Sequence, residues 1–241
     1  MRIERLLLYI VMSIVLLDIN ISPAGDKLSL SIGVGYGAYK MGDFYNSSIS
    51  SSYGNTPNEV SKQLAVGNGF NFNAEILYDL RYNLSVGSGI SYLYGSKRWN
   101  LEFDAERYGL TGEAEGQFGN DCRGSDIKFY FPYIVLKQNL KNAYLISFVK
   151  MGLGFGFGNF DVSAFDNYSF PTSGPGFLAT IGSSFSVNSG TSADFEIGYR
   201  IIRTKKLSCK NDLNLYYQLY FADLPLDFSG IFIQSSFSFR L

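Results

Sequence analysis

The sequence predicts an all-β protein, an eight-stranded antiparallel transmembrane β-barrel preceded by a cleavable signal peptide. Three observations support this prediction. Segments of about ten residues alternate large apolar side chains with small or polar ones, which is the period and length of a tilted membrane strand. Aromatic residues make up 17% of the chain, and 26 of its 241 residues are glycine. The N-terminus carries an apolar run that is too short to cross a bilayer as a helix.

The N-terminus has the features of an export signal. Two arginines precede an apolar run from Leu6 to Leu17, and Asp18 ends that run well below the roughly 20 residues that a spanning helix needs. Small residues follow and offer a cleavage region. We therefore assign residues 1–25 to a signal peptide and residues 26–241 to the barrel domain. An uncleaved helical anchor is the alternative interpretation.

Eight segments carry the alternating pattern. Their large apolar residues share one face, and the opposite face carries mainly glycine, serine and asparagine. In chain order they are Leu28–Tyr39, Phe70–Tyr78, Leu84–Tyr94, Asp126–Lys137, Ala143–Phe157, Gly176–Val187, Ser192–Ile202 and Gly230–Leu241. Because the small polar face cannot form a soluble core, the apolar face should point outward to lipid. A soluble β-sandwich or a lipocalin-like barrel would point its apolar face inward.

Short turns alternate with long connections between these segments. Three turns are short, and the four long connections are Gly42–Ala65, Lys97–Ser125, Phe160–Pro175 and Arg203–Asp227. Short turns on one side and long loops on the other are typical of outer-membrane barrels. We expect the last segment to close the ring against the first. A ten-stranded barrel is the alternative, because Leu213–Phe221 also alternates, but we interpret that stretch as a strand extension or a hairpin within the fourth loop.

These segments resemble the small outer-membrane β-barrel superfamily that includes the membrane domain of OmpA, OmpX and OmpW. The resemblance rests on PYIVLKQNL followed by YLISFVKMGLGFGF, on FLATIGSSFSVNSGTSADFEIGYRI and on the closing DFSGIFIQSSFSFRL. It implies export through the periplasm to the cell outer membrane, contact with outer-membrane lipid and insertion by the barrel-assembly machinery. Such barrels commonly end in phenylalanine, whereas this chain ends in Leu241, so its assembly signal would be a variant.

Eight strands leave an interior that side chains can fill. The inward face carries charges of nearly balanced sign, and these should pair because an isolated buried charge is costly. The predicted ionic network of the lumen consists of Glu75, Lys128, Lys150, Asp194, Glu196, Arg200 and Arg240. We expect Arg240 and Asp194 to lie near the same rim. A structural plug is the predicted role of this network, and a proton or ion path is the alternative.

The two cysteines, Cys122 and Cys209, fall in the second and fourth long connections. The sequence around Cys122 is acidic and the sequence around Cys209 is basic, which favours contact between the two loops. An exported protein can hold a disulfide between them. Two free thiols or an intermolecular bond are the alternatives.

The composition excludes most enzyme chemistry. The chain has no histidine, which excludes Ser–His–acid or Cys–His catalysis and a histidine-ligated metal site. The glycine-rich stretch 152–158 lacks the lysine and the strand–turn–helix setting of a phosphate-binding loop, so we interpret it as relief of crowding on a strand. We predict no enzymatic activity, no metal and no cofactor. A net charge of −1 gives no indication of a nucleic-acid partner.

Two functions remain. In the first, the protein is a monomeric structural or surface-binding barrel that displays four extracellular loops, and their aromatic residues contact an extracellular ligand. The predicted loop contacts are Trp99, Phe103, Tyr168 and Phe170. In the second, the protein is a narrow channel or transporter for small apolar molecules, with Leu213–Leu226 at its mouth. The small strand number favours the first function.

Overall fold

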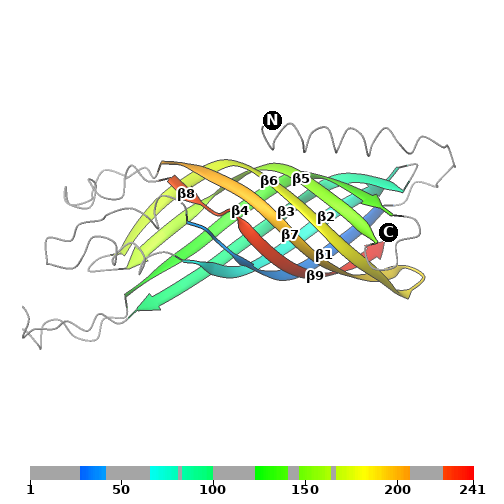
Figure 1. The fold of residues 1–241 in the computed structure, drawn as a ribbon, viewed down its shortest axis with the longest axis horizontal. Coiled ribbons are helices and arrows are strands. Elements are labelled where there is room, and N and C mark those ends of the chain that lie inside the picture. Colours follow the sequence, from blue (N-terminus) through cyan, green and yellow to red (C-terminus); the bar gives the residue numbers. More distant parts are fainter. Residues whose placement is uncertain are drawn as a thin grey trace, which may run out of the picture.

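The computed structural model describes residues 28–41, 66–80, 83–99, 123–140, 147–163, 167–206 and 225–241. These residues form an all-β barrel (Figure 1). Its strands are β1 (Leu28–Ala38), β2 (Asn68–Asp79), β3 (Leu84–Trp99), β4 (Arg123–Asn139), β5 (Phe148–Ser163), β6 (Asn167–Asn188), β7 (Thr191–Lys206), β8 (Pro225–Asp227) and β9 (Gly230–Arg240). The predicted signal peptide, residues 1–25, lies outside the described residues. No helix in the described part of the chain is long and apolar enough to cross a membrane.

Eight strands close the ring, as the sequence predicts. Each strand from β1 to β7 pairs antiparallel with the next, and β9 lies between β7 and β1. The closing pairing runs from Ser29 opposite Arg240 to Gly37 opposite Phe232. On its other side, β9 pairs with β7 from Thr191 opposite Phe239 to Arg200 opposite Gly230. The expectation that the last strand closes against the first is therefore confirmed.

The short strand β8 continues the wall beyond the start of β9. It pairs with the end of β7, where Arg203 lies opposite Asp227. On the other side, the N–H groups of Lys40 and Met41, just after β1, donate to Ser229 O at 3.0 Å and Asp227 O at 2.8 Å. Residues 225–229 thus fill the gap between β7 and β1. The segment Leu213–Phe221, which raised the ten-strand alternative, lies outside the described residues.

The third long connection was predicted wrongly. Apart from residues 164–166, the stretch Phe160–Pro175 belongs to the paired strands β5 and β6, and Phe160 lies opposite Phe170. Prolines ordinarily mark the end of a strand. Here Pro171 and Pro175 both lie inside the pairing, opposite Asn159 and Phe155. Only residues 164–166 separate the two strands.

The outer face of the barrel is apolar, as expected for a surface in contact with lipid. Ile134, Leu153 and Ile231 are 69%, 66% and 58% exposed, and many other large apolar side chains of the strands point outward with them. Small inward residues allow the ring to close. In β1, for example, Ser29, Ser31 and the glycines from Gly33 to Gly37 alternate with outward apolar residues.

Candidate functional site

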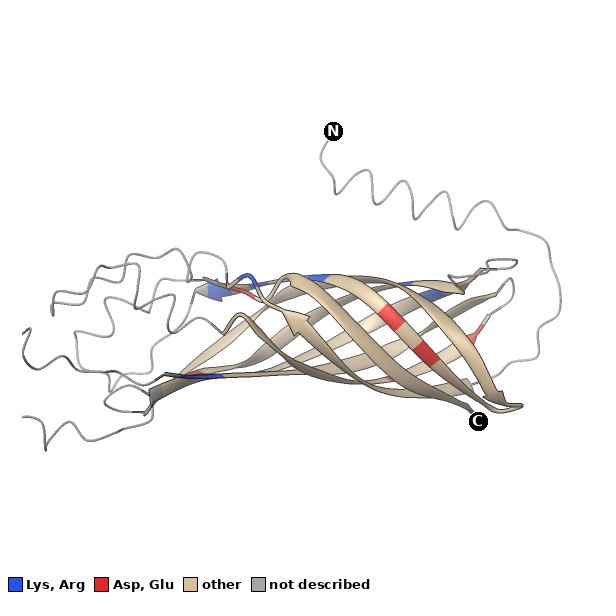
Figure 2. Cartoon of the chain, turned by 60° about the horizontal axis from the view of Figure 1, so that its bottom comes forward, with Lys and Arg blue, Asp and Glu red and all other residues tan. Residues whose placement is uncertain are grey.

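The barrel interior contains nearly all of the buried polar groups, whereas most of the wall is uncharged (Figure 2). We call the end that holds Leu28 and Leu241 the turn end, and the opposite end, which holds Met41 and Leu226, the loop end. The interior is polar from the turn end to the middle and apolar at the loop end. These two regions differ in chemistry, and side chains of both project into the lumen.

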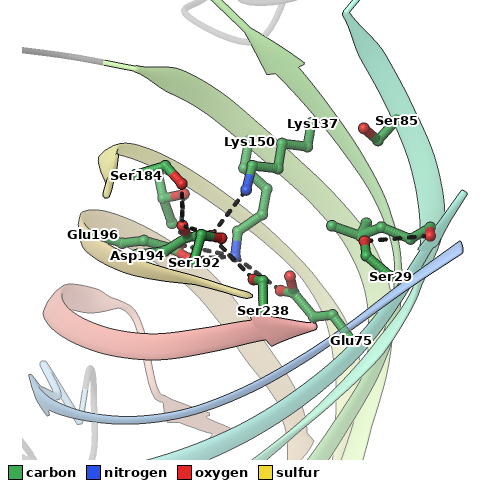
Figure 3. Close-up of polar contacts among 12 residues, drawn as sticks. Ser29, Glu75, Ser85, Lys137, Lys150, Ser184, Ser192, Asp194, Glu196 and Ser238 are labelled. Atoms are coloured by element: carbon green, nitrogen blue, oxygen red, sulfur yellow. Dashed lines mark hydrogen bonds and ion pairs between the residues drawn. The ribbon is translucent and has the colours of Figure 1, made fainter. Parts of the chain in front are cut away.

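A buried ionic triad crosses the middle of the lumen (Figure 3). Lys150 Nζ lies 2.9 Å from Glu75 Oε1 and 2.8 Å from Glu196 Oε2, and all three side chains are 3% exposed. They come from β5, β2 and β7, none of which is a neighbour of another in the ring. The contacts therefore span the interior instead of following the wall.

Neutral groups complete the hydrogen bonding of the two carboxylates. The Tyr133 hydroxyl donates to Glu75 Oε1 at 2.6 Å, and the Thr180 hydroxyl donates to Glu196 Oε2 at 3.0 Å. The glycines of the neighbouring strands make room for the tyrosine ring. A Cβ at Gly89 would lie 2.7 Å from Tyr133 Cζ, and one at Gly152 would lie 3.0 Å from its Cδ2. The glycine-rich stretch 152–158 thus faces a crowded interior.

A second cluster surrounds Asp194 closer to the turn end. Lys137 Nζ lies 3.0 Å from Asp194 Oδ2, and the ammonium group also lies 4.0 Å from the centre of the Phe148 ring. Ser184 donates to Oδ1 of the carboxylate at 2.6 Å, and Ser238 donates to Oδ2 at 3.2 Å. Because these partners come from β4, β6 and β9, the Asp194 carboxylate of β7 connects the closing strand to the rest of the ring (Figure 3).

Arg200 marks the boundary between the polar and apolar parts of the interior. Its side chain is buried, and its guanidinium carbon lies 4.9 Å from the Tyr39 ring centre and 5.2 Å from the Phe232 ring centre. Such distances allow a cation–π interaction. Nε and Nη2 make no hydrogen bond within the described residues, and no carboxylate in that part of the chain lies within ion-pair distance.

The loop end of the lumen is filled by an apolar cluster that sequence reasoning missed. Its members are large, buried side chains from several strands: Met41, Ile127, Phe129, Phe160, Phe170, Ile202, Leu226 and Phe228. The Phe129 ring from β4 lies 4.8 Å from the Phe228 ring, which follows β8 on the opposite side of the barrel. A signal was present in the sequence, because both faces of the segment DIKFYFPYIVLK are apolar.

Little space remains between the two regions. A cavity of about 10 Å³ is lined by Glu75 and Lys150 of the triad together with Asn71, Gln234 and Arg200. This volume is close to that of a single water molecule. Among the described residues, no group of three or more His, Cys, Asp or Glu side chains could hold a metal ion.

The structure brings together part of the predicted lumen network. Glu75, Lys150 and Glu196 meet directly, Asp194 binds Lys137, and Arg200 lies buried among aromatic rings. The prediction that Lys128 faces the lumen is wrong. Its side chain is 50% exposed on the outer face and lies 3.3 Å from Asp161. In the segment 126–131 the apolar residues Ile127, Phe129 and Phe131 are buried in the interior, so the expectation that apolar residues face lipid put Lys128 on the wrong face.

Two further predicted positions differ from the structure. Arg240 lies near the same rim as Asp194 on the neighbouring strand, as expected, but its side chain is exposed and makes no ion pair within the described part of the chain, and Lys137 binds Asp194 instead. Phe170 was predicted as a loop contact, but it is fully buried in the apolar cluster. The side chains of Trp99 and Tyr168, and all of Phe103, Cys122 and Cys209, lie outside the described residues.

Comparison with known proteins identifies the fold. No protein-family model matches the chain, and no curated protein matches it in sequence. The outer membrane protein OprG from Pseudomonas aeruginosa is 13% identical, with 90% of this chain and 96% of that chain covered at a TM-score of 0.51. The fold is that of a small outer-membrane β-barrel.

Other barrels of this kind align at lower TM-scores. Neisserial surface protein A (NspA) is 10% identical, with 90% of this chain and 100% of that chain covered at a TM-score of 0.47. The attachment invasion locus protein Ail of Yersinia pestis, in complex with the heparin analogue sucrose octasulfate, is 13% identical, with 90% and 100% covered at 0.46.

Proposed function

We propose that this protein is an integral outer-membrane barrel that presents binding segments at its loop end and does not conduct solutes. The observation that carries this proposal is the closed interior. The Lys150 triad fills the middle of the lumen, and the cluster around Phe129 and Phe228 fills the loop end. An eight-stranded ring is narrow enough for side chains to fill it completely. The narrow channel that the sequence left as an alternative has no comparable support.

The outer face supports residence in a membrane. Aromatic rings follow one another around β1 to β5: Tyr36 and Phe70 are 5.4 Å apart, Tyr92 and Tyr130 are 4.9 Å apart, and Tyr130 and Phe157 are 5.9 Å apart. Bands of aromatic residues flank the apolar belt of outer-membrane barrels at the water–lipid boundaries. In this proposal the loop end faces outward from the cell, and residues 1–25 direct export.

The binding segments would be the long connections at the loop end. Residues 42–65, 100–122 and 207–224 leave the barrel there, and the predicted ligand contacts Trp99, Phe103 and Tyr168 lie within or beside these connections and the 164–166 turn. Loops on a rigid scaffold commonly carry binding residues. The buried ion pairs and aromatic contacts would supply that rigid scaffold. Phe170 is no longer part of this proposed contact set because it is buried.

Limited proteolysis of intact cells tests the placement and orientation. Protease added outside should cleave within 42–65, 100–122 and 207–224 and leave the strands intact, because these connections would face the medium. Cleavage at the turns 81–82 and 141–146 should require a permeabilised outer membrane. The opposite pattern would refute the orientation, and recovery of the full-length chain in a soluble fraction would refute membrane residence.

Electrical recording tests the closed interior. The refolded barrel in a planar lipid bilayer should give no stable conductance steps above the bare membrane, because the Lys150 triad and the cluster around Phe129 and Phe228 would obstruct the lumen at two levels. Steady openings in the wild-type protein would refute a non-conducting barrel and favour the channel alternative.

A further inference from the structure

Three exposed cations lie together on the outer wall at the loop end. Arg203 and Lys205 alternate along β7 with the buried Ile202 and Thr204, so their side chains point outward. Lys40 follows β1 and is also exposed. We call Lys40, Arg203 and Lys205 the basic cluster.

The wall between β7 and β1 brings these cations close to one another. Lys40 N–H donates to Ser229 O, and Arg203 lies opposite Asp227, so the same short segment flanks both residues. Lys40 Nζ lies 5.5 Å from the Tyr199 ring centre. A hydrogen bond with Tyr199 raises the pKa of Lys40 and attraction from Asp227 adds to the rise, while desolvation and repulsion from Arg203 only partly oppose it. Lys205 lies roughly 7 Å further along β7 on the same face.

The cluster has an excess of positive charge. Asp227 is the carboxylate within it, and Asp227 Oδ1 already accepts a hydrogen bond from Ser229 N–H at 2.8 Å. Three cations and one carboxylate leave two positive charges. In the part of the chain that the structure describes, none of the three cations is in an ion pair.

The opposite wall shows a different arrangement at the same end of the barrel. Arg98 lies 3.2 Å from Asp126, and Lys128 lies 3.3 Å from Asp161. These two exposed cations of β3 and β4 are therefore each paired with a carboxylate on a neighbouring strand. Among the described side chains at this end, Lys40, Arg203 and Lys205 on the opposite wall lack such a pair.

The position of the cluster indicates its partner. Toward the turn end, the same outer face becomes apolar. Ile201 is the next outward residue of β7 in that direction, and Ile231 is the first of the exposed apolar residues of β9. The cations thus lie at the border of the lipid-facing wall, which is the level of lipid headgroups. Cations at this level attract anionic headgroups.

We propose that Lys40, Arg203 and Lys205 bind the phosphate groups of anionic lipid in the outer leaflet. This inference rests on the membrane placement proposed above. Charge complementarity selects an anionic partner, and continuity with the apolar wall selects a lipid, whose acyl chains would lie along Ile201 and Ile231. A soluble anion would contact the cations alone.

Native mass spectrometry of the full barrel tests the proposal. The refolded protein is incorporated into nanodiscs of phosphatidylcholine with a small fraction of phosphatidylglycerol, and the phosphatidylglycerol retained after release is counted. The variant Arg203→Gln/Lys205→Gln should bind it at least about tenfold more weakly, because each cation near a headgroup surface contributes substantially to anionic lipid binding. The matched control is Arg98→Gln/Lys128→Gln, which removes one arginine and one lysine from the neutralised wall and should retain wild-type binding.

Four outcomes decide the inference. A selective loss in the β7 variant supports it, and an equal loss in both variants would overturn it by showing a response to net charge alone. No loss in either variant would also overturn it. Displacement of the lipid by millimolar inorganic phosphate would assign the cluster to a soluble anion and overturn the lipid source. A chain that inserts into no bilayer would refute the proposed function as well, whereas an inserted barrel without selective loss refutes only this inference.

Discussion

Lys150 and Glu75 form an ion pair of 2.9 Å across the lumen, between two strands that are separated in the ring by β3 and β4. Such a contact differs from a cross-strand pair on the wall, because it fixes the distance between opposite sides of the barrel. With Glu196 as a second carboxylate, Lys150 ties three separate strands together. The buried side chains therefore fill the interior and also connect strands that are not neighbours in the ring.

Replacement of Lys150 by methionine should destabilise the barrel strongly. Glu75 and Glu196 would remain buried without their shared cation, and breaking a buried ion pair from one side costs about 3–5 kcal/mol. The free energy of unfolding, measured by urea titration in detergent micelles, should fall by this amount. Lys128→Met is the matched control, because it breaks an exposed ion pair and should change the same quantity by about 1 kcal/mol or less. Equal effects of the two substitutions would show that the triad contributes no more than a surface pair.

Replacement of Asp194 should destabilise the barrel far more than replacement of Arg240. Asp194→Ala removes the acceptor for Lys137, Ser184 and Ser238 and leaves the lysine largely buried, at a cost of about 3–5 kcal/mol. Arg240→Ala alters an exposed side chain and should change stability by about 0.5 kcal/mol or less. Urea titrations of both variants measure the difference. A larger loss for Arg240→Ala would favour the arrangement expected from the sequence, in which Arg240 belongs to the ionic network of the lumen.

The architecture could be predicted from the sequence because its cause is local. A lipid-facing wall requires a large apolar residue at every second position, and this period is visible in any one strand, as in Gly230–Leu241. The number of strands and the closure of the ring follow from counting such segments. Pairing between charges inside the lumen was expected on general grounds, since unpaired buried charges are costly.

The partners of each charge could not be predicted, because they depend on the stagger of the strands around the ring. Lys137 lies 57 positions from Asp194 in sequence, and nothing local identifies it as the partner. The period also fails where both faces of a strand are apolar. Phe129 and Phe131 point inward while Lys128 points outward, the reverse of the pattern nearer the turn end, and Ile202 and Arg203 on β7 show the same reversal. The same failure hid the apolar cluster and placed Phe170 in a loop.

The substitution Gly156→Ala, which adds one methyl group, should disturb the apolar cluster. A Cβ at this position would lie 2.5 Å from Phe129 Cζ and even closer to Cε1, so the ring must move within a packed interior. Such overpacking costs about 1–3 kcal/mol. Gly190→Ala is the matched control, since a Cβ there would meet only Asn188 Oδ1 at 3.9 Å, and its effect should stay within about 0.5 kcal/mol. Thermal unfolding of both variants followed by gel mobility measures the contrast, and similar stabilities would show that the Phe129 ring has room to move.

Two groups of side chains fill the lumen at different levels, and we expect that both must be removed before the lumen opens. The triad at Lys150 and the cluster around Phe129 and Phe228 each join strands across the interior, at different levels. Removal of one should leave the other in place, so neither Glu75→Ala/Lys150→Ala/Glu196→Ala nor Phe129→Ala/Phe228→Ala should raise the conductance of a planar bilayer appreciably. The variant that combines all five substitutions should conduct, because an aqueous path would then cross both levels.

Conductance from the triple variant alone would show that the apolar cluster does not close the loop end. Conductance from the double variant alone would show that the triad does not close the middle of the lumen. A fivefold-substituted barrel that folds, as judged by its heat-dependent gel mobility, and still does not conduct would place a third closure elsewhere in the lumen.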